Sequence, residues 1–360
     1  MAIPLNLVIN PLSFGQVSLG ILRELYKRNE DVRLTLTANQ FDLSSEEQDE
    51  GFELWLKKSI NDFTSEHSRD DKIFKLWHLN GALESFSKEQ VLLSFYELDE
   101  PTREEINAVK NNTKVLFSNN ETIKLFKGLG CENVGHLPLA YDNHNFHETP
   151  VDYNDDRVVF TLLGKFEKRK NHAKVIKSWL KRFGNDKKYA LHCALWNPFF
   201  SAEQNNQSIA DILDGNKYFN VVFSGFMKKN KQYNEFLNSA HVVLGMSGGE
   251  GWGLPEFHSV GLGKHAVILD CSGYLEWAND SNSVLVPPSG KTPIYDDLFF
   301  LKGAPWNQGQ CYTFNEHAFI ASCEEAIKRV EKNRVNEEGK KLKEKFTYSN
   351  MVDSIIKELN

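Results

Sequence analysis

The 360-residue sequence lacks the features that mark several large protein classes. Its five cysteines are odd in number and scattered, with no C-x-x-C pair, so we expect reduced thiols and not a disulfide framework. No apolar run approaches the roughly 20 residues of a membrane span. The first residues are too short an apolar run, and too uncharged, for a signal peptide. These absences favour a protein of the cytoplasm.

Positive charge is also scarce. The formal net charge is −7, from 42 Lys and Arg against 49 Asp and Glu, and the pI is near 5.9. This balance argues against a dominant nucleic-acid-binding surface, although local basic patches remain. The sequence has no D-x-D, H-E-x-x-H, P-loop or G-x-G-x-x-G motif, and its histidines show no tetrahedral ligand spacing. We therefore expect neither a metal nor a cofactor.

The sequence does contain a βαβ pattern that occurs twice. Apolar runs in the first half predict buried strands at 5–9, 33–37, 73–78, 91–97 and 115–118. A second set follows at 158–163, 189–194, 221–223, 240–246 and 265–270. The length suits two domains of ordinary size. The pattern predicts an α/β protein with Rossmann-like domains at 1–145 and 155–340, joined near 140–155 and followed by a helix within 341–360.

Residues 248–258 (Gly-Gly-Glu-Gly-Trp-Gly-Leu-Pro-Glu-Phe-His) join the end of a buried strand to a helix that opens at Pro255. In open α/β sheets ligands bind at this point, because free N–H groups and the helix dipole favour anions. We interpret the four glycines as positions where the backbone approaches a ligand closely. Glu250 is the one charged side chain within the glycine-rich part, residues 248–253.

Residues 164–171 (Gly-Lys-Phe-Glu-Lys-Arg-Lys-Asn) follow the first strand of the second half. Lys165 and Lys170 lie five residues apart, and two such cations can hold the phosphates of a nucleoside diphosphate. The alternative is a solvated basic surface. His78 and Glu97 stand at strand ends that would open to a cleft, although residues at such positions more often have a structural role than a catalytic one. Gly15 is either a turn residue or part of a ligand-facing loop.

Residues 248–258 resemble the E-G-F-G-L-P-x-x-E signature of retaining GT-B glycosyltransferases of the family-4 type. Residues 164–171 are similar to the family's G-R-L-x-x-x-K-G motif, 223–226 to its F-x-G and 273–276 to its G-G-x-x-E. The resemblance implies the GT-B fold, with two facing Rossmann-like domains, a central cleft and a last helix that crosses back. It also implies transfer of a sugar from a UDP- or GDP-sugar, with retention and without a metal.

The resemblance assigns roles to individual residues. Glu250 falls on the glutamate that contacts the donor sugar, while Lys165 and Lys170 fall on the diphosphate-binding pair, so these three are predicted to be catalytic. The donor-binding positions would be Gly15, Gly164, Gly225, Gly251, Trp252, Gly253, Leu254 and His258. His78 and Glu97 would lie on the acceptor or sugar side.

His258 departs from the family pattern, because the ribose-binding residue there is a glutamate. With an ordinary pKa of about 6.5, His258 would make donor affinity vary between about pH 6 and 8. The alternative is a helix histidine packed beside Trp252 with no ligand contact.

The sequence does not identify the acceptor. A saccharide, a small molecule or a protein remains open. A modified DNA base does too, since the chain weakly resembles phage-encoded transferases, which would act in the host cytoplasm. A GT-B phosphorylase or epimerase, or a nucleotide-binding module without turnover, remains an alternative. No role follows for the Pro-, Gly- and aromatic-rich insertion at 287–312.

Overall fold

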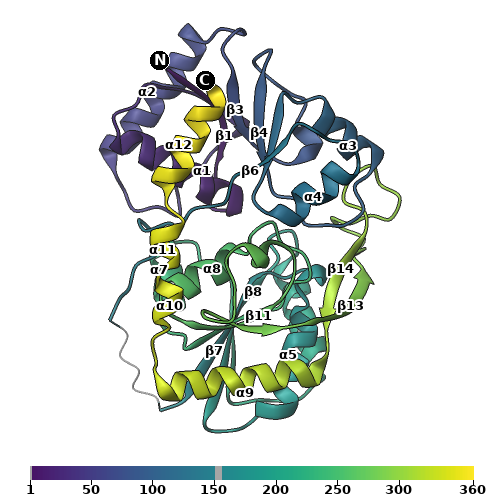
Figure 1. Ribbon diagram of the computed structural model, residues 1–360. Helices are drawn as coiled ribbons and strands as arrows, with labels where there is room; N and C mark the ends of the chain where they lie inside the picture. The colour runs from purple at the N-terminus through teal and green to yellow at the C-terminus, as the bar shows by residue number, and fades with distance from the viewer. Residues whose placement is uncertain (1, 151–155) are drawn as a thin grey trace.

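The computed structural model describes residues 2–150 and 156–360, which form two α/β domains, one above the other in Figure 1. Each domain is built on a six-stranded sheet whose strand pairs are parallel. The sequence-based prediction of two Rossmann-like sheets is confirmed. Part of the predicted joining region, 151–155, lies outside the described residues.

The first sheet has the strand order β2-β1-β3-β4-β5-β6. Its strands are β1 (Ile3–Ile9), β2 (Val32–Phe41), β3 (Ile73–Leu76), β4 (Gln90–Ser94), β5 (Lys114–Phe117) and β6 (Val134–His136). The helices are α1 (Ser13–Lys27), α2 (Glu50–Glu66), α3 (Arg103–Lys110) and α4 (Asn120–Gly128). All seven residues of β1 are buried, as expected for an interior parallel strand with both faces covered.

The turn after β1 is short. Gly15 was predicted to lie in a turn or a ligand-facing loop, but α1 already begins at Ser13. The Oδ1 atom of Asn10 accepts a hydrogen bond from the Leu12 N–H at 3.0 Å, which completes a turn within three residues. Gly15 therefore lies in the first turn of the helix.

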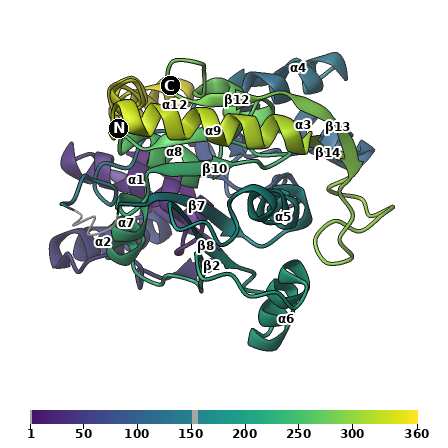
Figure 2. The same cartoon turned by 90° about the horizontal axis from the view of Figure 1, so that it is seen from below.

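The second sheet has the order β12-β11-β10-β7-β8-β9. Its strands are β7 (Val158–Lys165), β8 (Tyr189–Trp196), β9 (Val221–Ser224), β10 (Val242–Gly245), β11 (His265–Leu269) and β12 (Val284–Val286). The helices of this domain are α5 (His172–Phe183), α6 (Ala202–Leu213), α7 (Asn230–Asn238), α8 (Leu254–Gly261) and α9 (Glu316–Lys332). Seen from below in Figure 2, α9 runs across the near side of the domain, where it packs on β11 and β12.

The chain returns to the first domain at its end. Helices α10 (Glu337–Lys340), α11 (Leu342–Lys345) and α12 (Tyr348–Leu359) rise along one side of the molecule in Figure 1. Thr347 caps α12 by accepting from the Asn350 N–H at 3.2 Å. Helix α12 packs on α1, and Lys114 Nζ pairs with Glu358 at 2.6 Å.

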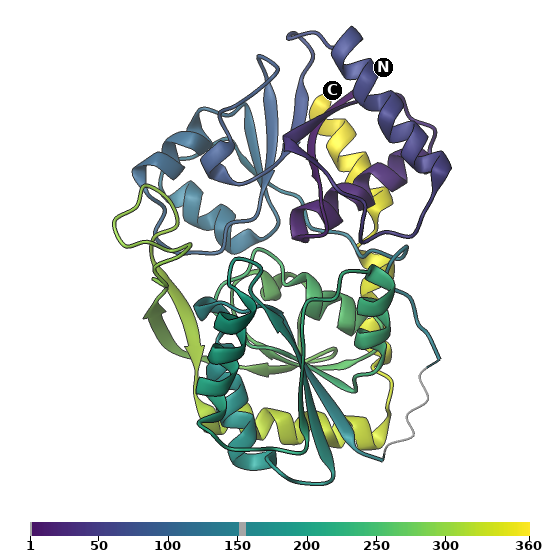
Figure 3. The ribbon, with the colours of Figure 1, turned by 180° about the vertical axis from the view of Figure 1, so that it is seen from behind.

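The insertion forms a hairpin that we call the arm, residues 288–314. It consists of β13 (Pro288–Pro293), β14 (Gln310–Phe314) and the loop between them. Figure 3 shows the arm reaching from the second domain up to the first. There Ile294 and Phe300 join a hydrophobic cluster with Leu98, while Lys291 Nζ pairs with Asp99 at 2.6 Å. The arm therefore ties the two domains together.

Candidate active site

Loops from both domains enclose a cavity of about 600 Å³. In the first domain it is lined by segments that follow β1, β3 and β4. In the second domain the lining segments follow β7, β8, β9 and β10. The carboxyl ends of parallel strands are where open α/β sheets bind ligands. The cavity thus lies where the sequence motifs predicted a site.

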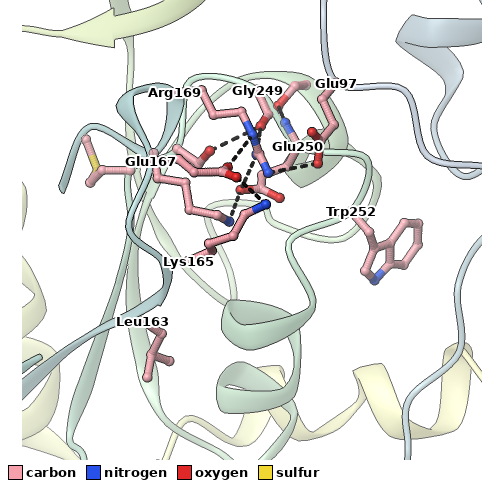
Figure 4. Close-up of polar contacts among 12 residues, drawn as sticks. Glu97, Leu163, Lys165, Glu167, Arg169, Gly249, Glu250 and Trp252 are labelled. Carbon is pink, nitrogen blue, oxygen red and sulfur yellow. Dashed lines mark hydrogen bonds and ion pairs between the residues drawn. The ribbon is translucent and has the colours of Figure 1, made fainter. Parts of the chain in front are cut away.

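Glu250 follows β10 and is buried in the cavity wall. Its Oε1 atom accepts a hydrogen bond from Lys170 Nζ at 2.5 Å and another from Arg169 Nη1 at 3.0 Å. Figure 4 shows the Arg169 side chain beside the Glu250 carboxylate. The structure therefore brings together Glu250 and Lys170, two of the three residues predicted to be catalytic.

Arg169, which the sequence analysis did not select, is the centre of this cluster. Its guanidinium lies 3.0 Å from Glu250, 3.0 Å from Glu97 and 3.1 Å from Glu167, and it donates to the Gly249 carbonyl at 2.5 Å. A 3-10 turn over Lys168–Lys170 buries Arg169 and Lys170 side by side. Three cationic residues in a row, Lys168–Lys170, could have pointed to Arg169, but the family motif aligns only with Lys170.

Glu97 comes from the opposite domain, just after β4. Its carboxylate pairs with Arg169 Nη2, and its carbonyl oxygen would lie 2.4 Å from a Cβ atom placed on Gly249. Glu97 thus joins the first domain directly to the loop that carries Glu250. The prediction that Glu97 faces the cleft agrees with this position, whereas its role toward a substrate stays a prediction.

The buried cluster shifts the pKa of its members in opposite directions. Burial raises the pKa of Glu97 to about 7, with Arg169 lowering it only in part and the charge of Glu250 adding to the rise. Burial would also raise the pKa of Glu250, but Lys170 and Arg169 outweigh it and hold that pKa well below its usual value. Near neutral pH Glu250 is therefore ionised, whereas Glu97 titrates, as does the buried Glu256 of α8, whose pKa burial also raises to about 7.

Lys165, the third predicted catalytic residue, lies at the edge of the same cluster. It lines the cavity and forms an ion pair with Glu167. Its ammonium also lies 4.3 Å from the ring centroid of Phe299 in the arm. Gly164 has a φ of +113°, and a Cβ atom there would lie 3.4 Å from the side chain of Lys170. The glycine lets the chain turn while the stem of Lys170 passes beside it.

The glycines of 248–253 allow close packing within the protein, which the sequence did not indicate, while their approach to a ligand stays a prediction. A Cβ atom on Gly248 would lie 1.9 Å from the Tyr312 carbonyl oxygen, and one on Gly251 would lie 2.7 Å from the Phe95 Cβ. Gly253, with a φ of +83°, would meet the ring of Tyr274 at 2.2 Å. Most of the close approaches are therefore to the arm and the first domain. Gly251 and Gly253 still line the cavity.

Four other predicted residues line the cavity: His78, Gly225, Trp252 and Leu254. His78 is exposed to the cavity, yet surrounding protein and the charge of Lys165 lower its pKa to about 4. The ring of Trp252 packs edge-on against Phe257 and lies apart from the charged cluster in Figure 4.

Gly15 is not among the lining residues. A Cβ atom there would lie 1.9 Å from the Asn10 carbonyl oxygen, so this glycine allows the tight turn between β1 and α1. Its neighbours Phe14 and Gln16 line the cavity instead.

His258 lies behind the cavity and is not among its lining residues. Its ring stacks on Phe146 with 4.2 Å between centroids, and only 2% of the residue is exposed. Burial lowers the pKa of His258 to about 3. The predicted titration of this residue between pH 6 and 8 is therefore wrong, because burial disfavours the charged form of the ring.

The arm contributes lining residues that the sequence did not reveal. Phe299, Phe300, Trp306 and Asn307 all face the cavity. The Asn307 N–H donates to Glu105 of the first domain at 2.8 Å, which holds this part of the loop in place. The cavity is thus closed on one side by the insertion.

In the described part of the chain, residues 2–150 and 156–360, no three His, Cys, Asp or Glu side chains are grouped as metal ligands would be. Nor does it contain a helix long and apolar enough to cross a membrane. The five cysteines are buried and form no disulfide with one another.

No protein-family model matches the sequence, and no curated protein matches it either. Solved structures do resemble it. HepE from Anabaena, solved in complex with UDP-glucose, has a TM-score of 0.67 at 14% identity over 100% of this chain and 99% of that one. A glycosyltransferase from Rickettsia africae has a TM-score of 0.69 at 9% identity over 99% and 97%. Sucrose-phosphate synthase from Thermosynechococcus elongatus has a TM-score of 0.67 at 10% identity over 99% and 98%.

These similarities extend over nearly the whole chain and show its fold. The protein has the GT-B fold, with two facing Rossmann-like domains around a central cleft. Because fold alone does not determine activity, the function has to be argued from the cavity and its charged groups.

Proposed function

We propose that this chain is a glycosyltransferase that takes its sugar from a UDP-sugar bound in the cavity between the domains. The observation that carries the proposal is the cluster of Glu250, Lys170 and Arg169 at the carboxyl ends of β7 and β10. The similarity to HepE, whose structure contains UDP-glucose, supports a uridine nucleotide as donor.

The donor diphosphate would bind beside Lys165 and Lys170. Lys165 lies at the cavity wall, and Lys170 is held next to Gly164 by a single carboxylate oxygen of Glu250. A diphosphate can take over part of this pairing. Cations placed in advance stabilise the charge that develops on a leaving diphosphate, and each is worth several kcal/mol in a site that excludes water.

Glu250 would then orient the hydroxyl groups of the donor sugar, since its second oxygen is not used by Lys170 or Arg169. The backbone N–H groups at the start of α8 add a favourable dipole near the phosphates. Retention of configuration belongs to the proposal. The acceptor hydroxyl would attack from the face that the diphosphate leaves, and a phosphate oxygen would take its proton.

Calorimetric titration with UDP tests the donor site. Lys165→Ala and Lys170→Ala should each weaken UDP binding roughly tenfold, more at low salt than at high salt. Lys181→Ala is the matched control, because this exposed residue of α5 pairs with Glu316 at the surface. If all three variants bind UDP like the parent, the cluster is not a diphosphate site.

Product analysis distinguishes a transferase from a phosphorylase. A transferase releases UDP from a UDP-sugar whether or not inorganic phosphate is present. A phosphorylase requires phosphate and forms a sugar phosphate, and that outcome would contradict the proposal.

A further inference from the structure

The two walls of the cavity differ in charge. The second domain contributes Lys165, Arg169 and Lys170. By contrast, the described lining residues of the first domain include no lysine and no arginine. His78 is neutral near pH 7, because surrounding protein and Lys165 lower its pKa to about 4. The positive charge of the cavity thus lies on the side where the donor would bind.

The carboxylates of the first-domain wall already have partners inside the fold. Glu97 pairs with Arg169 at 3.0 Å. Glu105 accepts from the Tyr96 hydroxyl at 3.0 Å and from the Asn307 N–H at 2.8 Å. Neither is arranged to counter a cation on a substrate. The wall therefore offers a ligand little net charge of either sign.

Uncharged hydrogen-bonding groups take the place of charges on this wall. The amide side chains of Asn10, Gln16, Gln40 and Asn80 line it. Each amide can both donate and accept, which suits a hydroxyl group that does the same. The Asn10 and Gln40 side chains are linked by a 2.6 Å hydrogen bond, so their remaining groups are held in a fixed orientation.

Aromatic rings form the rest of the wall. Phe14 stacks on Phe95 with 4.4 Å between centroids and lies 4.3 Å from the ring of His78. Trp77 extends this group, with its ring 5.9 Å from Phe14. The negative face of an aromatic ring attracts the slightly positive C–H groups of a sugar ring, while hydroxyls at the sugar edge meet the amides.

The cavity is also closed at two places by contacts between the domains. Near α7 the Asn230 side chain donates to Glu46 at 2.6 Å. At the arm, Thr102 Oγ1 donates to the Pro305 carbonyl at 2.6 Å. A volume of about 600 Å³ suits one ligand of moderate size. A nucleotide sugar would fill most of it, which leaves room for an acceptor group of about one sugar ring.

From these features we infer that the acceptor is an uncharged saccharide whose terminal ring binds against Phe14, His78 and the amides of the first-domain wall. This inference rests on the proposed function. Arginine and lysine side chains give phosphate groups their strongest contacts, and the described residues of this wall include neither. On this wall a flipped DNA base would find aromatic rings but no lysine or arginine to contact its backbone. A phosphorylated sugar or a modified DNA base is therefore disfavoured.

Saturation-transfer NMR on the full chain, with UDP added in excess, tests the inference. The probes are neutral methyl glycosides and disaccharides, the matching sugar phosphates, a short single-stranded oligonucleotide and a serine-containing peptide. We expect signal transfer to at least one neutral saccharide, and binding of the matching phosphate to be weaker by roughly tenfold, or about 1.4 kcal/mol. Asn80→Lys should reduce that preference, while the neutral control Asn80→Gln should keep it.

Each other outcome has a definite meaning. Stronger binding of the sugar phosphate, the oligonucleotide or the peptide would overturn the inference, as would binding of none of the saccharides while UDP still binds. If UDP itself fails to bind in a separate calorimetric titration, the proposed function fails and the inference fails with it. The UDP titration therefore separates the two failures.

Discussion

Replacement of Arg169 by methionine should destabilise the protein much more than replacement of an exposed arginine. Arg169 contacts three carboxylates, but its removal does not leave all three without a cationic partner. Glu250 keeps Lys170 and Glu167 keeps Lys165, whereas Glu97 loses the cation that pairs with it. Removing one partner of a buried ion pair costs about 3–5 kcal/mol. Because only one carboxylate is left without a cationic partner, we expect the free energy of unfolding to fall by about 3 kcal/mol.

The expected loss depends on pH in a direction that can be worked out. Arg169 lowers the pKa of Glu97, which burial raises to about 7. Without Arg169 this pKa rises further. A carboxyl group whose pKa is raised in the folded state binds a proton more readily there than in the unfolded chain, so stability increases as pH falls through that pKa. The difference in stability between the parent protein and Arg169→Met should therefore become smaller as the pH falls from 8 to 6.

Thermal unfolding followed by circular dichroism measures both effects. For domains of this size 1 kcal/mol corresponds to about 2–4 °C, so Arg169→Met should lower the Tm by about 6–12 °C at pH 8. Arg182→Met is the matched control. Arg182 pairs with Glu324 on the surface, and an exposed pair contributes about 0–1 kcal/mol. Equal shifts for the two variants, or a deficit that does not change with pH, would refute this reasoning.

Three further outcomes are expected. Glu250→Gln should keep or tighten UDP binding, because Lys170 loses its carboxylate partner. The same variant should release UDP from a UDP-sugar about a hundredfold more slowly. Turnover equal to that of the parent protein would show that Glu250 takes no part in the reaction. His258→Gln should leave the pH dependence of donor affinity between pH 6 and 8 unchanged, since that histidine stays neutral; a flattened titration would contradict this. Gly251→Ala should lower stability by about 1–3 kcal/mol in thermal unfolding, through the contact with Phe95, whereas Gly128→Ala meets no atom within 4 Å and should not.

The strands were predictable because a parallel sheet covered on both faces requires continuous apolar runs, which β1 and β10 supply. The placement of Lys170 and Glu250 in one site followed from the resemblance of two motifs that come after neighbouring strands. These features depend on local sequence and on a topology common to many α/β proteins. That is why they could be found without coordinates.

The rest of the site depends on contacts between distant segments. Nothing in the sequence around Glu97 indicates that Arg169 of the other domain pairs with it. The insertion gave no sign that its aromatic residues would close the cavity, because that follows from where the hairpin packs. His258 was misjudged for a related reason, since the stacking on Phe146 that buries it comes from a segment more than a hundred residues away.

The central claim is that a nucleotide sugar binds between the two domains. Thermal unfolding in the presence of UDP, GDP, ADP and their glucose conjugates tests it most directly, because a ligand that binds only the folded state stabilises it by about 2.7 kcal/mol at a hundred times its Kd. We predict that UDP and UDP-glucose raise the Tm, and that Lys170→Ala lessens the rise while Lys181→Ala does not. If none of these nucleotides changes the Tm of the parent protein, the cavity is not a donor site and the account is wrong.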